Sequence, residues 1–198
     1  MRTIYISQDD KESKMIQVRH NVFETNSSST HSIAIPRKVN DKEIPKSFVF
    51  NFGDFGWEDD EVDPCDYLYT AIYNCDQSMI TERLQKLSDC LERHHISYTF
   101  SKPKPAWWDT SELDYGNIDH ASELESCGFF SILEDDNLLL RYLAVGRVFT
   151  GNDNSEDESD DCFSALSTVT EYDDEGYWMQ VPNPNHDEEE YQYFFKGN

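Results

Sequence analysis

The chain has 198 residues, of which 37% are hydrophobic and 14% aromatic. It is long enough to form one domain with its own core, and it is too aromatic for a fully disordered acidic protein. Its formal net charge is −24. This charge argues against direct binding to nucleic acid or to anionic membranes, because each phosphate contact requires a nearby cation.

The acidic residues are concentrated in the later part of the chain. Residues 1–57 carry 8 basic and 7 acidic side chains, residues 58–150 carry 7 and 19, and residues 151–198 carry 1 and 14. We therefore predict a single body over residues 1–150, followed by an acidic segment, 151–198, that returns a strand to that body. A charged, solvated exterior explains this distribution as well as an acidic face directed at a partner does.

The cysteine pattern predicts free thiols. The five cysteines are irregularly spaced and form no C-x-x-C pair. The first residues lack the apolar core of a signal peptide, and no apolar run approaches the roughly 20 residues of a membrane helix. We expect reduced cysteines and a cytoplasmic protein. The cysteines are Cys65, Cys75, Cys90, Cys127 and Cys162.

Strand patterns come first along the chain. Residues 3–7 and 15–23 read as short strands, residues 32–35 resume an extended pattern, and residues 47–52 alternate phenylalanines with polar residues. Together they predict a small antiparallel sheet within residues 1–57. Further strands are expected at 96–100, 147–150, 162–172 and 191–195.

Helices are predicted in the middle of the chain. Asp63 as N-cap and Pro64 at the first helical position start one helix, and leucines at helical spacing indicate a second over about 77–94. His94-His95 ends the second helix; the pair is interpreted first as a C-terminal cap and alternatively as a metal ligand. A short helix is expected at 121–127 and an apolar one at 137–145. The predicted class is α+β, a small antiparallel sheet covered by a helical hairpin and one further apolar helix.

One stretch, Asn21 to Pro36 (NVFETNSSSTHSIAIP), differs from an ordinary loop. It places a run of small polar residues, ending in His31, between two strand candidates. Two other polar stretches also follow or adjoin predicted elements, namely Asp119-His120 and Gly151 to Asn154. Each of the three can project chemistry from the end of a rigid element.

These stretches resemble a family of proteins found in bacteriophages and their hosts. That family carries an ETNSSSTHS-like segment, an FGDFGW-like turn, a later D-H dipeptide and a GNDN-like segment. In this chain they are Glu24 to Ser32, Phe52 to Trp57, Asp119-His120 and Gly151 to Asn154. The resemblance spans roughly residues 16–155. It implies a phage origin and one shared polar site, and it implies no particular reaction.

The polar stretches suggest several kinds of site. Loop hydroxyls and amides can hold an anion such as phosphate, and histidine with carboxylates can act in acid–base chemistry or hold a divalent ion. The same side chains can instead stabilise turns by bonding to nearby backbone. A Ser–His–Asp hydrolase is conceivable, although the chain has no G-x-S-x-G elbow. The candidates are His31, Ser29, Asp119 and His120 for catalysis; Asn26, Ser27, Ser28, Thr30, Asn152 and Asn154 for ligand binding; and His31, His120 and Asp153 for a metal.

Two functions follow from these features. The favoured one is a non-enzymatic phage protein that binds and disables a basic, nucleic-acid-binding protein in the host cytoplasm, its carboxylates standing in for phosphates. The alternative is an enzyme or small-ligand binder for a phosphate-bearing compound, centred on residues 25–31 and served by a divalent metal. The expected partner-binding acidic face comprises Glu58, Asp59, Asp60, Glu61, Glu156, Asp157, Glu158, Asp160, Asp161, Asp173, Asp174, Glu175, Glu188, Glu189 and Glu190.

Overall fold

The computed structural model describes residues 29–40, 42–56, 60–106, 109–152, 163–173 and 176–197. The strands predicted at residues 3–7 and 15–23 lie outside these ranges. The strands are β1 Ser29–Pro36, β2 Ser47–Phe50, β3 Asp54–Phe55, β4 Asp60–Val62, β5 Ser97–Phe100, β6 Lys104–Pro105, β7 Leu113–Asp114, β8 Asn117–Ile118, β9 Arg147–Asn152, β10 Thr168–Tyr172, β11 Trp178–Pro182 and β12 Tyr191–Lys196. The α-helices are α1 Pro64–Asn74, α2 Ile80–Arg93, α3 Glu123–Ser126 and α4 Asp136–Val145, with 3₁₀ turns η1 Gln77–Met79 and η2 Phe129–Glu134.

A four-stranded antiparallel sheet forms the centre of the molecule, in the order β12-β1-β9-β4. The central strand β1 pairs with β9 and β12, and both partners lie more than 100 positions away in the sequence. The prediction that residues 1–57 form a local sheet is wrong for the described part of that range. The sheet forms non-locally because β1, buried along nearly its whole length, requires a strand on each side.

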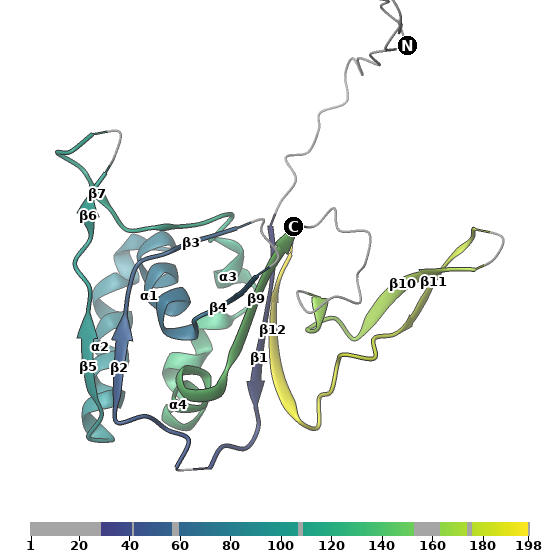
Figure 1. Ribbon diagram of the computed structural model, residues 1–198, viewed down its shortest axis with the longest axis horizontal. Coiled ribbons are helices and arrows are strands. Elements are labelled where there is room, and N and C mark those ends of the chain that lie inside the picture. The colour runs from purple at the N-terminus through teal and green to yellow at the C-terminus, as the bar shows by residue number, and fades with distance from the viewer. Residues whose placement is uncertain are drawn as a thin grey trace, which may run out of the picture.

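The strands expected at 47–52 and 96–100, found as β2 and β5, pair with each other instead. They run parallel in register, with Ser47 opposite Ser97 and Phe50 opposite Phe100. A parallel pair requires a long crossover, and here α1, η1 and α2 supply it. Figure 1 shows this pair on the other side of the helices from the four-stranded sheet.

Helix α1 lies between the two sheets and contacts both β2 and β9. Its start is the predicted one: the Asp63 side chain accepts hydrogen bonds from the backbone of Cys65 and Asp66, with Pro64 at the first position. Seven of its eleven residues are buried. A helix enclosed on several sides needs apolar residues all round, which explains its weak amphipathic pattern.

Helices α2 and α4 complete the covering layer. Helix α2 buries Leu87, Cys90 and Leu91, and α4 packs on β1 through an apolar face. The chain leaves α4 at Gly146, where a Cβ would lie 2.4 Å from the carbonyl oxygen of Tyr142. Only glycine fits this close approach. The α+β class, with an antiparallel sheet covered by a helical hairpin and a further apolar helix, is confirmed.

The opposite face of the sheet is covered by the C-terminal segment. Phe149 and Phe163 form a small second apolar cluster there, joined by Leu166 and Phe195. The backbone of Ala165 donates a hydrogen bond of 2.9 Å to the Ser32 hydroxyl. The sheet is therefore enclosed on both faces over β1.

The C-terminal segment contributes one strand to the sheet and one separate hairpin. β12 pairs with β1, whereas β10 pairs only with β11. The strand expected within 162–172 is present as β10, but it does not join the main sheet, because its described residues pair with β11. Figure 1 shows this hairpin extending away from the rest of the molecule.

The described cysteines are free: Cys65, Cys75, Cys90 and Cys127. Burial raises the pKa of the Cys75 thiol to about 12 and that of Cys65 further. Within the ranges given above, no helix combines the length and the apolar character that crossing a bilayer requires.

Candidate functional site

A row of polar residues crosses the helix-facing side of the sheet at one end. The strand register places Lys196 and Thr150 on either side of His31. Two residues further along, Phe194 and Val148 flank Ile33 in the same way, and those side chains belong to the core. The hydroxyl-rich motif thus joins the sheet at the end where the apolar core side chains stop and a cluster of polar side chains begins.

His31 is fully buried beneath α1. Its Nδ1 atom lies 2.6 Å from the Tyr67 hydroxyl, and the two rings meet edge to face with centroids 5.5 Å apart. Its Nε2 atom has no hydrogen-bond partner among the described residues. Burial, and next the positive charge of Lys196, lower the pKa of His31 to about 3. The imidazole is therefore neutral near pH 7 and cannot serve there as a proton donor of the imidazolium type.

Lys196 is a buried cation, with a relative exposure of 1%. Its Nζ donates hydrogen bonds to the Ser29 carbonyl at 2.7 Å and to the Ser29 hydroxyl oxygen at 2.8 Å. A buried ammonium group persists only with such partners, since an unpaired one would lose its proton. Lys196 thus ties the last strand to the first residue of β1.

Ser29 also binds the loop that carries Asp119. Its backbone N–H donates to Asp119 Oδ2 at 3.3 Å, and its hydroxyl donates to the Asp119 carbonyl at 3.2 Å. The Asp119 backbone in turn donates to Phe55, whose strand β3 pairs with β8. The D-H dipeptide therefore contacts two of the other segments on which the family resemblance depends: the hydroxyl motif at Ser29 and the aromatic turn at Phe55.

His120 lies at the edge of this cluster. Its Nε2 is 3.9 Å from Asp119 Oδ1, and its side chain is 45% exposed. Its φ of 50° is left-handed, a conformation that a non-glycine residue seldom adopts. This backbone turns the chain from β8 toward α3 and directs Asp119, rather than His120, at β1.

The remaining predicted site residues are placed apart or lie outside the described ranges. Thr30 is buried on the opposite face of the sheet from His31, as the alternation of a strand requires. Asn152 pairs through its backbone with Ser29. The residues Asn26, Ser27, Ser28, Asp153 and Asn154 lie outside the described part of the chain.

Two members of this cluster, Tyr67 and Lys196, are not among the site residues that the sequence predicts. Tyr67 resembled an ordinary core aromatic of α1. Lys196 had a signal: it is the one basic residue in 151–198. A lone cation in an acidic, strand-forming segment is a candidate for a buried ion or hydrogen-bond partner.

The predicted acidic face is only partly within the described ranges. Asp173, Glu188, Glu189 and Glu190 are exposed, whereas Glu61 accepts two hydrogen bonds from the Arg147 guanidinium at 2.7 and 3.1 Å. Arg147 holds the pKa of Glu61 below its usual range. Asp60 is described by its backbone alone, as part of β4. The others, Glu58, Asp59, Glu156, Asp157, Glu158, Asp160, Asp161, Asp174 and Glu175, lie outside the described part.

The β10–β11 hairpin, residues 168–182 and hereafter the arm, exposes large apolar side chains. Tyr172, Tyr177 and Trp178 are 72%, 68% and 69% exposed, and Tyr172 and Trp178 are opposite one another in the register. The arm also carries exposed Glu171 and Asp173. No lysine or arginine occurs between residues 163 and 195.

The base of the arm is held by the preceding residues of the C-terminal segment, which cover the sheet. The buried side chain of Asn183 donates hydrogen bonds to the carbonyls of Phe163 at 3.1 Å and Leu166 at 2.8 Å. Its backbone donates to Ser167. The arm thus has a held base and an exposed aromatic, acidic end, an arrangement suited to contact with another molecule.

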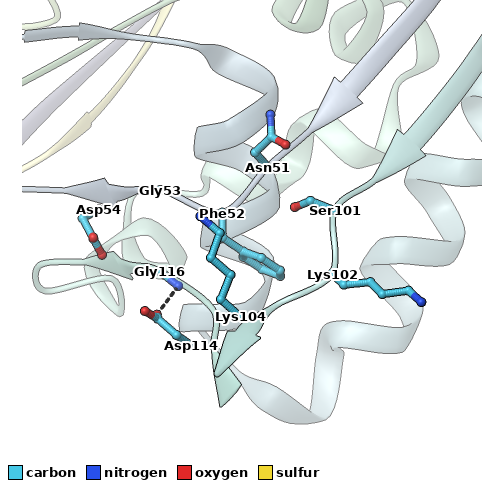
Figure 2. Close-up of a pocket in the computed structure, with 9 residues that line it drawn as sticks. All are labelled: Asn51, Phe52, Gly53, Asp54, Ser101, Lys102, Lys104, Asp114 and Gly116. Carbon is cyan, nitrogen blue, oxygen red and sulfur yellow. Dashed lines mark hydrogen bonds between the residues drawn. The ribbon is translucent and has the colours of Figure 1, made fainter. Parts of the chain in front are cut away.

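A pocket of about 290 Å³ lies between the ends of β2 and β5 (Figure 2). Its rim carries Lys102 and Lys104 as well as Asp54 and Asp114, so the charges balance. One oxygen of Asp114 accepts a hydrogen bond from the Gly116 backbone at 2.9 Å, drawn in Figure 2. Such a rim does not favour an anionic ligand. The pocket is lined by Asn51, Phe52, Gly53, Asp54, Ser101, Lys102, Lys104, Asp114 and Gly116.

Comparison of the chain with protein-family models, with curated proteins and with solved structures finds no match.

Proposed function

We propose that this protein is a binding protein whose arm engages a basic surface on another protein. The observation that carries the proposal is the exposure of Tyr172, Tyr177 and Trp178 among carboxylates, on a hairpin free of lysine and arginine. Exposed aromatic residues are uncommon on surfaces that meet only water, and tyrosine and tryptophan are enriched where binding energy is concentrated.

The chemistry of the arm selects a cationic partner. Carboxylates steer a positively charged surface toward the arm and pair with lysine or arginine at contact. The aromatic rings add cation–π contacts with the same side chains. A chain with a net charge of −24 repels acidic partners. The binding should weaken as salt rises, because salt screens exposed charges.

The partner class that best fits this chemistry is a nucleic-acid-binding protein. Such a protein presents a groove of lysine and arginine spaced for phosphates, and carboxylates can occupy the same positions. The bound protein would then be inhibited by exclusion of its nucleic acid. In the setting that the family resemblance implies, this is a phage protein acting on a host protein in the host cytoplasm, in counter-defence or host takeover.

The test is capture of partners from cells by the intact protein and by a variant that neutralises the arm, Glu171→Gln with Asp173→Asn. A matched control, Glu82→Gln with Glu92→Gln, removes two exposed charges on α2, far from the arm (Figure 1). We expect a basic protein that is captured at low salt, lost at high salt, retained by the control and released at least several-fold by the arm variant. Its nucleic-acid binding should fall when the intact protein is added.

Capture that is indifferent to salt, or equal for the arm variant and the control, would contradict the proposal. So would a partner that binds nucleic acid and this protein at the same time.

The polar cluster favours a second candidate, a binder or enzyme for a small phosphate-bearing compound. The observation is the convergence of Ser29, His31 and Asp119 with the buried cation of Lys196. Its test is the thermal unfolding midpoint with inorganic phosphate and nucleotides, with and without divalent metal. A rise in the intact protein that His31→Gln abolishes supports it, and an unchanged midpoint with every compound counts against it.

A further inference from the structure

We propose, beyond the binding function above, that Cys90, His94 and Asp136 form a binding site for a divalent metal of the zinc class. One ligand atom of each residue lies within 4.8 Å of the other two. His94 Nε2 is 3.3 Å from Asp136 Oδ2, close to the spacing of two ligands on one tetrahedral zinc ion, for which metal–ligand distances are about 2.0–2.3 Å.

The fold holds two of these ligands on one turn of α2. Cys90 and His94 are four residues apart, so their side chains lie on the same face of the helix. Two backbone hydrogen bonds cap the end of the helix. The N–H of Ile96 donates to the Leu91 carbonyl at 2.9 Å, and the N–H of His95 donates to the Glu92 carbonyl at 3.1 Å. His95 takes the left-handed position of this cap, with φ of 56°. The C-terminal cap predicted for the His-His pair is present, and it fixes the backbone that carries His94.

The third ligand comes from a different element and is held in place by a neighbour. Asp136 is the first residue of α4. Arg93 donates to Asp136 Oδ2 through Nε at 2.9 Å and to Oδ1 through Nη2 at 2.6 Å. In the metal-free protein Asp136 Oδ2 also takes the contact with His94 Nε2 at 3.3 Å, and a metal ion bound between the two side chains would replace that contact. A hydrogen-bonded carboxylate of fixed orientation is typical of metal ligands in proteins.

The donor set indicates the metal. A thiolate sulfur, an imidazole nitrogen and a carboxylate oxygen together select zinc, or cobalt as its spectroscopic substitute, over magnesium and calcium, which prefer oxygen alone. Three protein ligands leave a fourth position for water. A pocket of about 470 Å³, lined by Lys46, His95 and Leu140 among others, reaches the cluster on the side of His94.

Binding requires one proton to leave. A cysteine is mainly the thiol at neutral pH, whereas the metal binds the thiolate. As the metal binds, the S–H bond breaks, a metal–sulfur bond forms and the proton passes to solvent. No oxidation or reduction is involved.

The test is titration of the reduced, full-length protein with Co²⁺, followed by displacement with Zn²⁺. We expect one equivalent of Co²⁺ to produce a thiolate-to-cobalt charge-transfer band, together with the visible bands of tetrahedral cobalt. Cys90→Ser should abolish the charge-transfer band. The half-exposed ligand variant His94→Gln, which leaves the core intact, should weaken affinity at least 10-fold, as should Asp136→Asn.

Two matched controls identify the site. His95→Gln changes the neighbouring histidine, and Cys127→Ser changes a partly buried cysteine of another element; both should bind as the intact protein does. The proposal is overturned if no charge-transfer band appears, or if the band persists in Cys90→Ser. It is equally overturned if His94→Gln and His95→Gln bind cobalt with the same affinity.

Discussion

The polar row of the sheet and the arm place opposite kinds of residue in unexpected environments: polar side chains are buried in the row, and large aromatic side chains are exposed on the arm. In the row, a lysine, a histidine and a serine are buried at 1%, 0% and 0% exposure. In the arm, the aromatic residues are about 70% exposed. The fold thus buries Lys196, which with Arg83 is one of two buried lysine or arginine side chains among the described residues, and leaves several large aromatic rings exposed. Ordinary partition by hydrophobicity would give the reverse.

This difference separates structural from binding roles. The polar row joins three distant parts of the chain through Ser29, so its hydrogen bonds are part of what closes the sheet. Beyond its base, the two strands of the arm pair only with each other among the described residues. Changes in the row should therefore act on folding, whereas changes at the end of the arm should act on binding.

The largest effect on stability is expected for Lys196→Met. Methionine preserves the length and apolar stem of lysine but donates no hydrogen bond to Ser29. Because hydrogen bonds from a buried charged group contribute about 1.5–3 kcal/mol, the free energy of unfolding should fall by about 2–3 kcal/mol in urea titrations. The exposed lysine variant Lys102→Met is the control and should leave the midpoint unchanged. Equal midpoints for the two variants would show that the buried cation does not hold the sheet.

A second, smaller effect concerns pH and His31. The folded pKa of about 3 lies below the ordinary value of 6.5, so the unfolded chain binds a proton more readily than the folded chain. This contribution to stability is complete above pH 6.5 and is lost as pH falls toward 3. One pH unit corresponds to about 1.4 kcal/mol, so about 2 kcal/mol should be lost by pH 5.

The measurement is the free energy of unfolding between pH 7 and pH 5 for the intact protein and for His31→Gln. Carboxylates titrate in both, and the groups that face His31, Lys196 and Asp119, remain in both. The difference between the two curves therefore isolates the imidazole. Parallel curves would mean that His31 accepts a proton in the folded protein, and hence that the polar row is open to water.

Local signals in the sequence predicted the elements but not their partners. Asp63 and Pro64 located the start of α1, and leucine spacing located α2, because caps and periodicity depend on neighbouring residues alone. The parallel pairing of β2 with β5 depends instead on where α1 and α2 direct the chain. No residue of either strand encodes that choice, so the sequence suggested a local antiparallel sheet.

In the candidate site, too, the sequence predicts individual residues but not all of their partners in space. The hydroxyl motif and the D-H dipeptide were singled out by composition, and the structure brings Ser29 and Asp119 into contact. Lys196 enters the cluster only through the β1–β12 register, and Tyr67 only through the docking of α1 on the sheet. Both depend on tertiary contacts that residue type and spacing do not specify.

The smallest effect on stability, and the sharpest test of the comparison, is expected for Trp178→Ala on the arm. Trp178 is 69% exposed, so its truncation removes little area that folding buries. It lies opposite Tyr172 in the register, and a cross-strand pair of this kind is worth about 0.2–1 kcal/mol. The free energy of unfolding should change by about 0.5 kcal/mol, within the scatter of surface substitutions.

The same variant should bind the cationic partner at least 10-fold more weakly, because truncating a central aromatic contact costs about 2 kcal/mol or more. The matched control is Val169→Ala, a buried residue of the same hairpin with 3% exposure. It should lower stability by more than Trp178→Ala does while altering the exposed aromatic end less. If Trp178→Ala instead destabilises the protein more than Val169→Ala, the tryptophan packs within the fold. The arm would then be another structural element like the polar row, and its exposed rings would no longer indicate a partner.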